Sequence, residues 1–221
     1  MNTNLIVIPS RGRPHNAERA FNAIKQTSNI SDLVFVLDKD DEQNYPRIPG
    51  ASYEVLPRIK MNKSLNAIAL KNIYTYETIT FMGDDHLTQT QNWDEVLYSP
   101  IKDRGFGLSY GDDSLQGEAL PTAVMISTNL IKILGFMAPH DLLHLYMDYF
   151  WLDLGRELNA INYFECVDIK HIHYGNTEGI YDKTYEEANS AFTVNEDYAV
   201  YENYKQNYFL DDVFRIKKML K

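Results

Sequence analysis

The sequence lacks several features that mark particular classes of protein. Its 221 residues include a single cysteine, Cys166, which excludes an internal disulfide and is typical of a reducing compartment. No Cys-x-x-Cys pair of a structural zinc site occurs. No run approaches the roughly 18 uninterrupted apolar residues that a membrane helix needs, and the first residues do not follow the signal-peptide pattern. We therefore expect a cytoplasmic protein with no membrane association.

Several well-known catalytic motifs are also missing. The chain contains no Gly-x-Gly-x-x-Gly, no phosphate-binding P-loop, no His-Glu-x-x-His and no Gly-x-Ser-x-Gly. These absences disfavour dinucleotide-dependent enzymes, P-loop ATPases, zinc proteases and serine hydrolases.

Charge is plentiful but unevenly placed. Lys and Arg number 21 against 31 Asp and Glu, a formal charge of −10, while 44% of the residues are hydrophobic, enough to build a globular core. A negative total disfavours nonspecific nucleic-acid binding. Residues 1–60 are nearly neutral, with 8 basic and 7 acidic side chains, whereas residues 61–180 have 7 and 16. The first third can therefore face a phosphate-bearing ligand.

Short apolar runs alternate with helical patterns along the chain. We expect strands near residues 5–8, 33–37, 52–56, 78–82, 107–110 and 123–126, and helices near 16–26, 62–73, 128–134 and 141–158. Continuous apolar strands separated by helices predict an α/β fold with a mainly parallel sheet. We expect residues 1–180 to form one domain and the Tyr-rich residues 181–221 to form a helical extension packed on it.

Acidic residues follow three of the expected strands, at 38–41, 84–85 and 112–113. Ligands of open α/β sheets bind at the carboxyl ends of the strands. We therefore expect these three acidic ends to meet in one crevice.

Two groups of residues are candidate metal ligands. Asp84, Asp85 and His86 follow the strand at 78–82 and suit Mg²⁺ or Mn²⁺, although an acidic turn with an incidental histidine has the same pattern. On an extended strand, His171 and His173 share one face. One of them could complete the metal site, or one is a core histidine and the other a surface histidine.

The expected helix at 141–158 places His140, His144 and Asp148 in one stripe, followed by Trp151. A carboxylate beside an aromatic ring could serve as a general base next to a stacking platform. The alternative is the solvated side of a core helix.

Cations gather in the first third of the chain: Arg11, Arg13, Arg58, Lys60 and Lys63. Arginine binds phosphate with two parallel hydrogen bonds, so this group suggests a diphosphate site. Ordinary surface charges are the alternative.

An ordered set of motifs resembles small glycosyltransferases of the GT-A fold, most closely the family 2-like group often encoded by bacteriophages. The set comprises Ile8-Pro9-Ser10-Arg11-Gly12-Arg13-Pro14, Leu37-Asp38-Lys39-Asp40-Asp41, Phe81-Met82-Gly83-Asp84-Asp85-His86, Trp93-Asp94, Tyr110-Gly111-Asp112-Asp113, Pro121-Thr122-Ala123 and Asp148-x-x-Trp151. The resemblance implies a Rossmann-like, mixed and mainly parallel sheet flanked by helices.

With the cation pattern, the resemblance assigns a role to each candidate. Donor binding falls to Pro9, Ser10, Arg11, Arg13, Asp38, Lys63 and Asp84. Mn²⁺ or Mg²⁺ would be held by Asp85, His86 and His173. The resemblance makes Asp148 the base, and Asp112, Asp113 and Trp151 are expected to contact the acceptor. The chain departs from the phage group after His173, where it reads Tyr174-Gly175 rather than a Pro and then Gly-Lys.

The resemblance implies transfer of a sugar from a nucleoside-diphosphate sugar, foremost a UDP-sugar, to a hydroxyl group with inversion. The implied acceptors are a hydroxymethylated base of phage DNA, in the host cytoplasm, or a surface glycan, with no obligate protein partner. A nucleotidyltransferase that releases pyrophosphate and a non-catalytic binding module are the alternatives.

Overall fold

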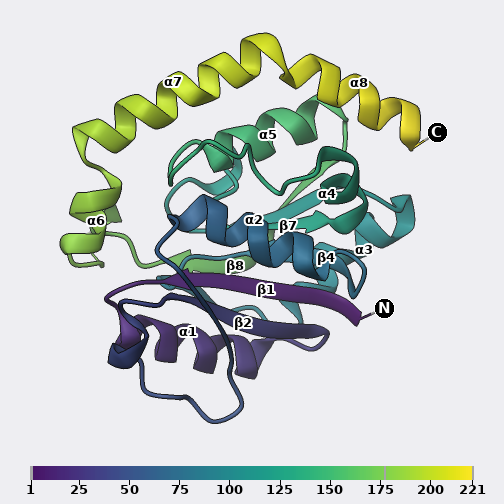
Figure 1. Ribbon diagram of the computed structural model, residues 1–221. Coiled ribbons are helices and arrows are strands. Elements are labelled where there is room, and N and C mark those ends of the chain that lie inside the picture. The colour runs from purple at the N-terminus through teal and green to yellow at the C-terminus, as the bar shows by residue number, and fades with distance from the viewer. Residues whose placement is uncertain (1, 177, 221) are drawn as a thin grey trace.

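A mixed eight-stranded sheet forms the centre of the computed structural model, which describes residues 2–176 and 178–220 (Figure 1). The strands are β1 (Asn2–Ser10), β2 (Ser31–Asp38), β3 (Ser52–Leu56), β4 (Tyr76–Phe81), β5 (His86–Thr88), β6 (Leu108–Asp112), β7 (Val124–Ser127) and β8 (Ile161–His171). Their order in the sheet is β3-β2-β1-β4-β7-β6-β8-β5.

Most of the strands are parallel. β1 pairs in parallel with β2 and β4, β2 with β3, and β6 with β8, whereas β7 is antiparallel to both of its neighbours. Strands β1 to β4, β6 and β8 therefore end at the same edge of the sheet, and the antiparallel β5 begins there at His86. The predicted mixed, mainly parallel α/β fold is confirmed.

Helices cover both faces of the sheet because its buried strands alternate their apolar side chains. Leu5 and Val7 of β1 pack in a core with α2 (Met61–Asn72), α4 (Thr128–Leu134) and α5 (Met147–Glu157). Ile6 and Ile8 point to the other face, where α1 (Pro14–Thr27) and α3 (Trp93–Arg104) lie. Period-two alternation along one buried strand thus forms two cores.

The C-terminal segment forms α6 (Lys183–Ala188), α7 (Ala191–Asn207) and α8 (Phe209–Met219). In Figure 1, α7 and α8 follow one another in an arc over α5 and α4, and α6 descends toward the sheet. Tyr201, Tyr204, Val213 and Ile216 are buried in the same core as α2, α4 and α5. None of the helices within residues 2–176 and 178–220 is long and apolar enough to cross a membrane.

The prediction of a helix over 141–158 is wrong in its first part. Helix α5 begins at Met147, after Tyr146 with a φ of 63°. Residues before Tyr146 form a loop, so His140 and His144 do not share a helical stripe with Asp148. Helix α3 was not predicted; it begins after a left-handed Asn92 and contains Pro100.

Candidate active site

A cavity of about 370 Å³ opens at the carboxyl edge of the sheet. It brings together most of the predicted site residues, from segments that are far apart in the sequence. The predicted residues that line it are Pro9, Ser10, Arg11, Arg13, Asp38, Asp84, Asp85, His86, Asp148, Trp151 and His173. The meeting of strand ends in one crevice is thus found as expected, except at 112–113.

Asp85, His86 and His171 offer three potential metal-ligand atoms that lie within 4.8 Å of one another. The rings of His86 and His171 stack with centroids 4.1 Å apart, because the first residue of β5 pairs with the last residue of β8. Asp85 Oδ1 lies 3.4 Å from His86 Nδ1 and 3.5 Å from His171 Nε2. One carboxylate and two imidazoles are a ligand set that suits Mn²⁺ better than the oxygen-preferring Mg²⁺.

The surroundings of this group fit a cation. Buried His171 Nδ1 has no hydrogen-bond partner and lies 3.8 Å from Asp113 Oδ2, too far for a hydrogen bond. A Cβ at Gly83 would lie 2.6 Å from Asp85 Oδ1 and 3.0 Å from His86 Nδ1. A side chain at position 83 would therefore fill the space beside the ligand atoms, and only glycine leaves it open.

The charges of the group depend on one another. Burial alone would raise the pKa of Asp85, but its contacts with the imidazoles of His171 and His86 outweigh burial and hold the pKa well below the usual range. Burial also opposes protonation of His171, yet the carboxylates of Asp113 and Asp85 raise its pKa to about 9. The pKa of His86 is lowered by burial and by the adjacent His171. Without a bound cation the stacked pair therefore favours its proton on His171, and a cation bound through His171 would have to displace this proton.

Arg13 and Asp84 line the cavity next to the metal-ligand group. Asp84 Oδ2 accepts a hydrogen bond of 2.5 Å from Ser10, and Arg13 Nη1 lies 3.5 Å from Asp84 and 3.4 Å from Asp85. Burial and the neighbouring Asp85 carboxylate raise the pKa of Asp84. A buried guanidinium between two carboxylates offers a fixed cation to an anionic ligand.

A second set of charges lies where β1 and β2 end. Arg11 Nη1 donates a hydrogen bond to Asp38 at 2.9 Å, and the guanidinium donates two further hydrogen bonds to Asp40. Burial raises the pKa of Asp38, although the hydrogen bond from Arg11 acts to lower it. Arg58 and Lys60, after β3, also line the cavity, and Arg58 pairs with Glu187 of α6.

Asp148 lies in the first turn of α5 and lines the cavity. Burial raises its pKa to about 6, although the N–H of Tyr149 donates to Oδ1 at 2.9 Å and favours the carboxylate. His144, in the loop before α5, also lines the cavity, and burial lowers its pKa to about 4. Near neutral pH the cavity therefore holds a carboxylate that can accept a proton and a neutral imidazole.

The choice of His173 as the metal-ligating histidine is not supported by this geometry. His173 lines the cavity but lies outside the ligand group. Strand pairing with β5 brings His171, rather than His173, beside His86.

The expected acceptor residues take other roles in the structure. Trp151 is fully buried against Phe81 and donates its indole N–H to the Met137 carbonyl at 2.8 Å, which leaves no exposed face for stacking. Asp113 is buried, and its carboxylate binds the N–H groups of Leu115, Gln116 and Gly117 and the Thr122 hydroxyl. It shapes the loop after β6.

Two further predicted residues lie away from the cavity. Asp112 accepts the N–H of Ser114 at the end of β6 and does not line the cavity. Lys63 is exposed on α2 and is likewise outside the lining, whereas Lys60, three residues earlier, belongs to it.

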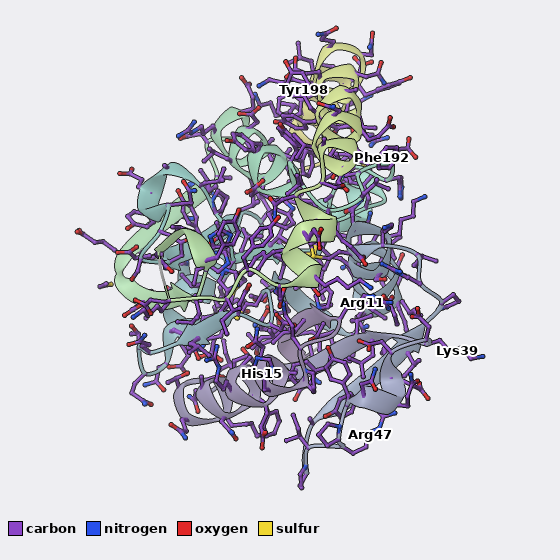
Figure 2. The ribbon with its side chains drawn as sticks, turned by 90° about the vertical axis from the view of Figure 1, so that its left-hand side faces the viewer. Arg11, His15, Lys39, Arg47, Phe192 and Tyr198 are labelled. Carbon is purple, nitrogen blue, oxygen red and sulfur yellow. The ribbon has the colours of Figure 1, made fainter. Side chains whose placement is uncertain are left out.

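The C-terminal extension contributes residues that the sequence patterns did not identify. The Tyr185 hydroxyl donates to Asp85 Oδ2 at 2.6 Å, and the guanidinium of Arg13 lies over its ring at 4.0 Å. Asp182 binds Arg13, and Thr184 donates to the Arg11 carbonyl at 3.0 Å. Figure 2 shows this side of the molecule, with Arg11 below α6 and the exposed Phe192 and Tyr198 on α7. The sequence shows that Asp182 can cap a helix, but it does not show that Asp182 binds Arg13.

Comparison with known proteins places the fold. No family model matches the chain, and no curated protein matches its sequence. Among solved structures, the mannosyltransferase PcManGT from Pyrobaculum calidifontis, in complex with GDP-Man and Mn²⁺, shares 11% identity over 97% of this chain and 73% of its own, with a TM-score of 0.61. Glucosyl-3-phosphoglycerate synthase from Mycobacterium tuberculosis, in complex with Mn²⁺, UDP and phosphoglyceric acid, shares 15% over 78% and 71%, with a TM-score of 0.56.

A third similar structure is TarS 1-349 from S. aureus, with 14% identity, 76% of this chain covered and a TM-score of 0.56. This chain spans only 60% of that one. At these identities the likeness concerns the fold alone, which is GT-A-like. The comparisons give no support to the expected bacteriophage origin.

Proposed function

We propose that the protein is a glycosyltransferase that moves a sugar from a nucleoside-diphosphate sugar, foremost a UDP-sugar, to an acceptor hydroxyl with the help of Mn²⁺. The observation that carries the proposal is the group of Asp85, His86 and His171 in the same cavity as Arg13 and Asp148. A cation site, a fixed guanidinium and a proton-accepting carboxylate are the equipment that transfer from a diphosphate requires.

The chain's own residues divide the task. Arg13, held against Asp84, would attract the charge of the diphosphate, while Ser10 and Asp38, which line the same cavity, would contact the nucleoside. Bound at Asp85, His86 and His171, a divalent cation would neutralise the charge of the departing diphosphate as a Lewis acid. Asp148 would take the proton of the acceptor hydroxyl, which attacks the anomeric carbon from the side opposite the leaving group, so that the configuration is inverted.

The acceptor is the less defined substrate. A DNA acceptor needs cations that are free to neutralise phosphates. The formal charge of −10, with 16 acidic against 7 basic side chains in residues 61–180, therefore favours a glycan hydroxyl over a hydroxymethylated DNA base.

The test is a panel of nucleotide sugars with Mn²⁺, screened for binding by thermal shift and then for products with glycan and hydroxymethylated-DNA acceptors. We expect release of a nucleoside diphosphate that depends on acceptor and metal and is abolished by chelation. Release of pyrophosphate in a parallel reaction with a nucleoside triphosphate and a sugar 1-phosphate would instead identify a nucleotidyltransferase. Donor binding without any product would identify a binding module and reject the enzyme.

A further inference from the structure

Asp197 of α7 is a fully buried carboxylate that binds three consecutive main-chain N–H groups of the loop before α5. Its Oδ1 accepts the N–H of Leu143 at 2.7 Å, and its Oδ2 accepts those of His144 at 2.9 Å and Leu145 at 2.7 Å. Hydrogen bonds to an ionised acceptor are stronger than bonds between neutral groups. The C-terminal extension therefore holds this loop through one side chain.

The other end of the same loop is held by α2. The Asn62 side-chain amide donates to the carbonyls of Pro139 and Leu142, and that of Asn66 donates to the carbonyl of Ala138. Both asparagines are buried. The loop is thus fixed by polar side chains from two helices, and only its second half depends on α7.

That second half lies directly before the candidate base. Leu143, His144 and Leu145 line the cavity, and Asp148 follows three residues after Leu145. Between them, Tyr146 has a φ of 63°, which a side chain of this size rarely adopts. This turn therefore needs support from its surroundings, and the ring of Tyr146 stacks on Tyr201 of α7 at 5.8 Å.

We propose that Asp197 is a positioning residue for the reaction proposed above. It acts through the main chain of Leu143 to Leu145 and sets the place of His144 and Asp148 in the cavity. Helix α7 is accordingly a part of the active-site framework. The inference rests on the proposed function, since positioning is defined relative to the proton transfer at Asp148.

An asparagine at position 197 separates this role from simple packing. It has nearly the shape of aspartate, but it has one acceptor oxygen in place of two, and its NH₂ group would face the N–H groups of the loop. At least one buried N–H would lose its partner, which favours a shifted loop. A displacement of about 1 Å at a reacting group can cost about 100-fold in rate.

Tyr201→Phe is the matched control. Tyr201 lies one turn further along α7. The substitution keeps the ring that stacks on Tyr146 and removes only the hydroxyl, which donates to Asp153 of α5 at 2.7 Å. This variant removes a buried polar link between α7 and the body of the protein, and it leaves Asp197 in place.

The experiment measures kcat, the donor KM and hydrogen exchange of the peptide covering residues 141–147 in both variants. In Asp197→Asn we expect kcat to fall about 10- to 100-fold with an unchanged donor KM, and the loop amides to lose protection. In Tyr201→Phe we expect kcat and loop protection to stay near those of the unmodified protein. Should Asp197→Asn not fold, Asp197→Glu keeps the charge one methylene further out, and a reduced kcat is again expected.

Two results would overturn the proposal. The first is that Asp197→Asn has the same kcat as the unmodified protein. If Asp197→Asn does not fold, the same result in Asp197→Glu counts instead. The other is an equal loss of kcat in Tyr201→Phe, which would assign the effect to docking of α7 in general. If the unmodified protein transfers no sugar, the proposed function fails, and the exchange comparison still decides the anchoring: unchanged protection in Asp197→Asn rejects it.

Discussion

The carboxylate of Asp182 accepts two hydrogen bonds, of 2.7 and 2.6 Å, from the guanidinium of Arg13, although 169 positions separate the two residues in the chain. Arg13 is buried, and its other contacts are with Asp84, Asp85 and the ring of Tyr185. The C-terminal extension is therefore joined to the candidate donor site by a charged pair rather than by apolar contact alone.

Loss of the Asp182 charge should loosen α6 from the site. Asp182→Asn keeps a side-chain oxygen for the helix cap on Tyr185 but removes the charge that faces buried Arg13. We expect a loss of about 1–2 kcal/mol in the free energy of unfolding, measured by urea titration. The control is Glu187→Gln, which breaks the more exposed pair with Arg58 and should cost at most about 0.5 kcal/mol. Equal losses in the two variants would contradict a special role for the Asp182 pair.

Activity should depend on the protonation of Asp148. A general base must be deprotonated, and burial raises the pKa of this carboxyl to about 6. We expect kcat/KM to fall as the pH decreases below about 6 and to be level above about 7. Asp148→Asn should reduce kcat by about 100- to 10,000-fold while donor binding persists. A variant that turns over at the unmodified rate would reject Asp148 as the base.

The same residue should reduce stability at neutral pH. The pKa of Asp148 is higher in the folded protein than the ordinary value of 3.8 for an aspartate, so the folded state holds its proton more tightly than the unfolded state. Its contribution to stability is therefore present at low pH and is lost as the pH rises through about 6. We expect Asp148→Asn to be more stable than the unmodified protein by about 1–2 kcal/mol at pH 8, and by less at pH 5. A difference that grows toward low pH would show that the sign is wrong.

Gly83 should be required for the metal site. A methyl group at this position would lie 2.6 Å from Asp85 Oδ1 and 3.0 Å from His86 Nδ1. We expect Gly83→Ala to weaken Mn²⁺ binding about 10- to 100-fold, measured by calorimetry in the presence of a nucleoside diphosphate. A circular dichroism spectrum that matches the unmodified protein would show that the effect is local. Unchanged affinity would mean that Mn²⁺ does not bind beside Gly83.

The sequence predicts the parts of the fold that follow from local patterns. Parallel strands β1 to β4 and β6 are short apolar runs, and helices α1, α2 and α4 show clear periodicity, whereas β8 was not among the predicted strands. Acidic residues mark the ends of β2, β4 and β6. The start of α5 was misjudged because Leu142 and Leu145 continue its apolar spacing. The Leu145 N–H donates to Asp197 and the Leu142 carbonyl accepts from Asn62, which holds these residues in a loop, and no local pattern reveals such distant partners.

Some site residues can likewise be predicted from local sequence patterns, and others depend on tertiary structure. Asp85 and His86 follow directly from the strand end at β4. The choice between His171 and His173 depends on the register of β5 with β8, which is a tertiary property. Tyr185 carries no signal of its own, because its contact with Asp85 exists only once α6 is folded against the sheet. Burial, rather than residue type, excludes Trp151 as a stacking platform.

The central claim is that Asp85, His86 and His171 hold the divalent cation that recruits the donor. Electron paramagnetic resonance of free Mn²⁺, titrated with the protein and a UDP-sugar, tests this claim directly in unmodified protein, His171→Ala and His173→Ala. We expect the unmodified protein and His173→Ala to remove Mn²⁺ from solution, and His171→Ala to leave it free. Binding that survives in His171→Ala but is lost in His173→Ala would contradict the account.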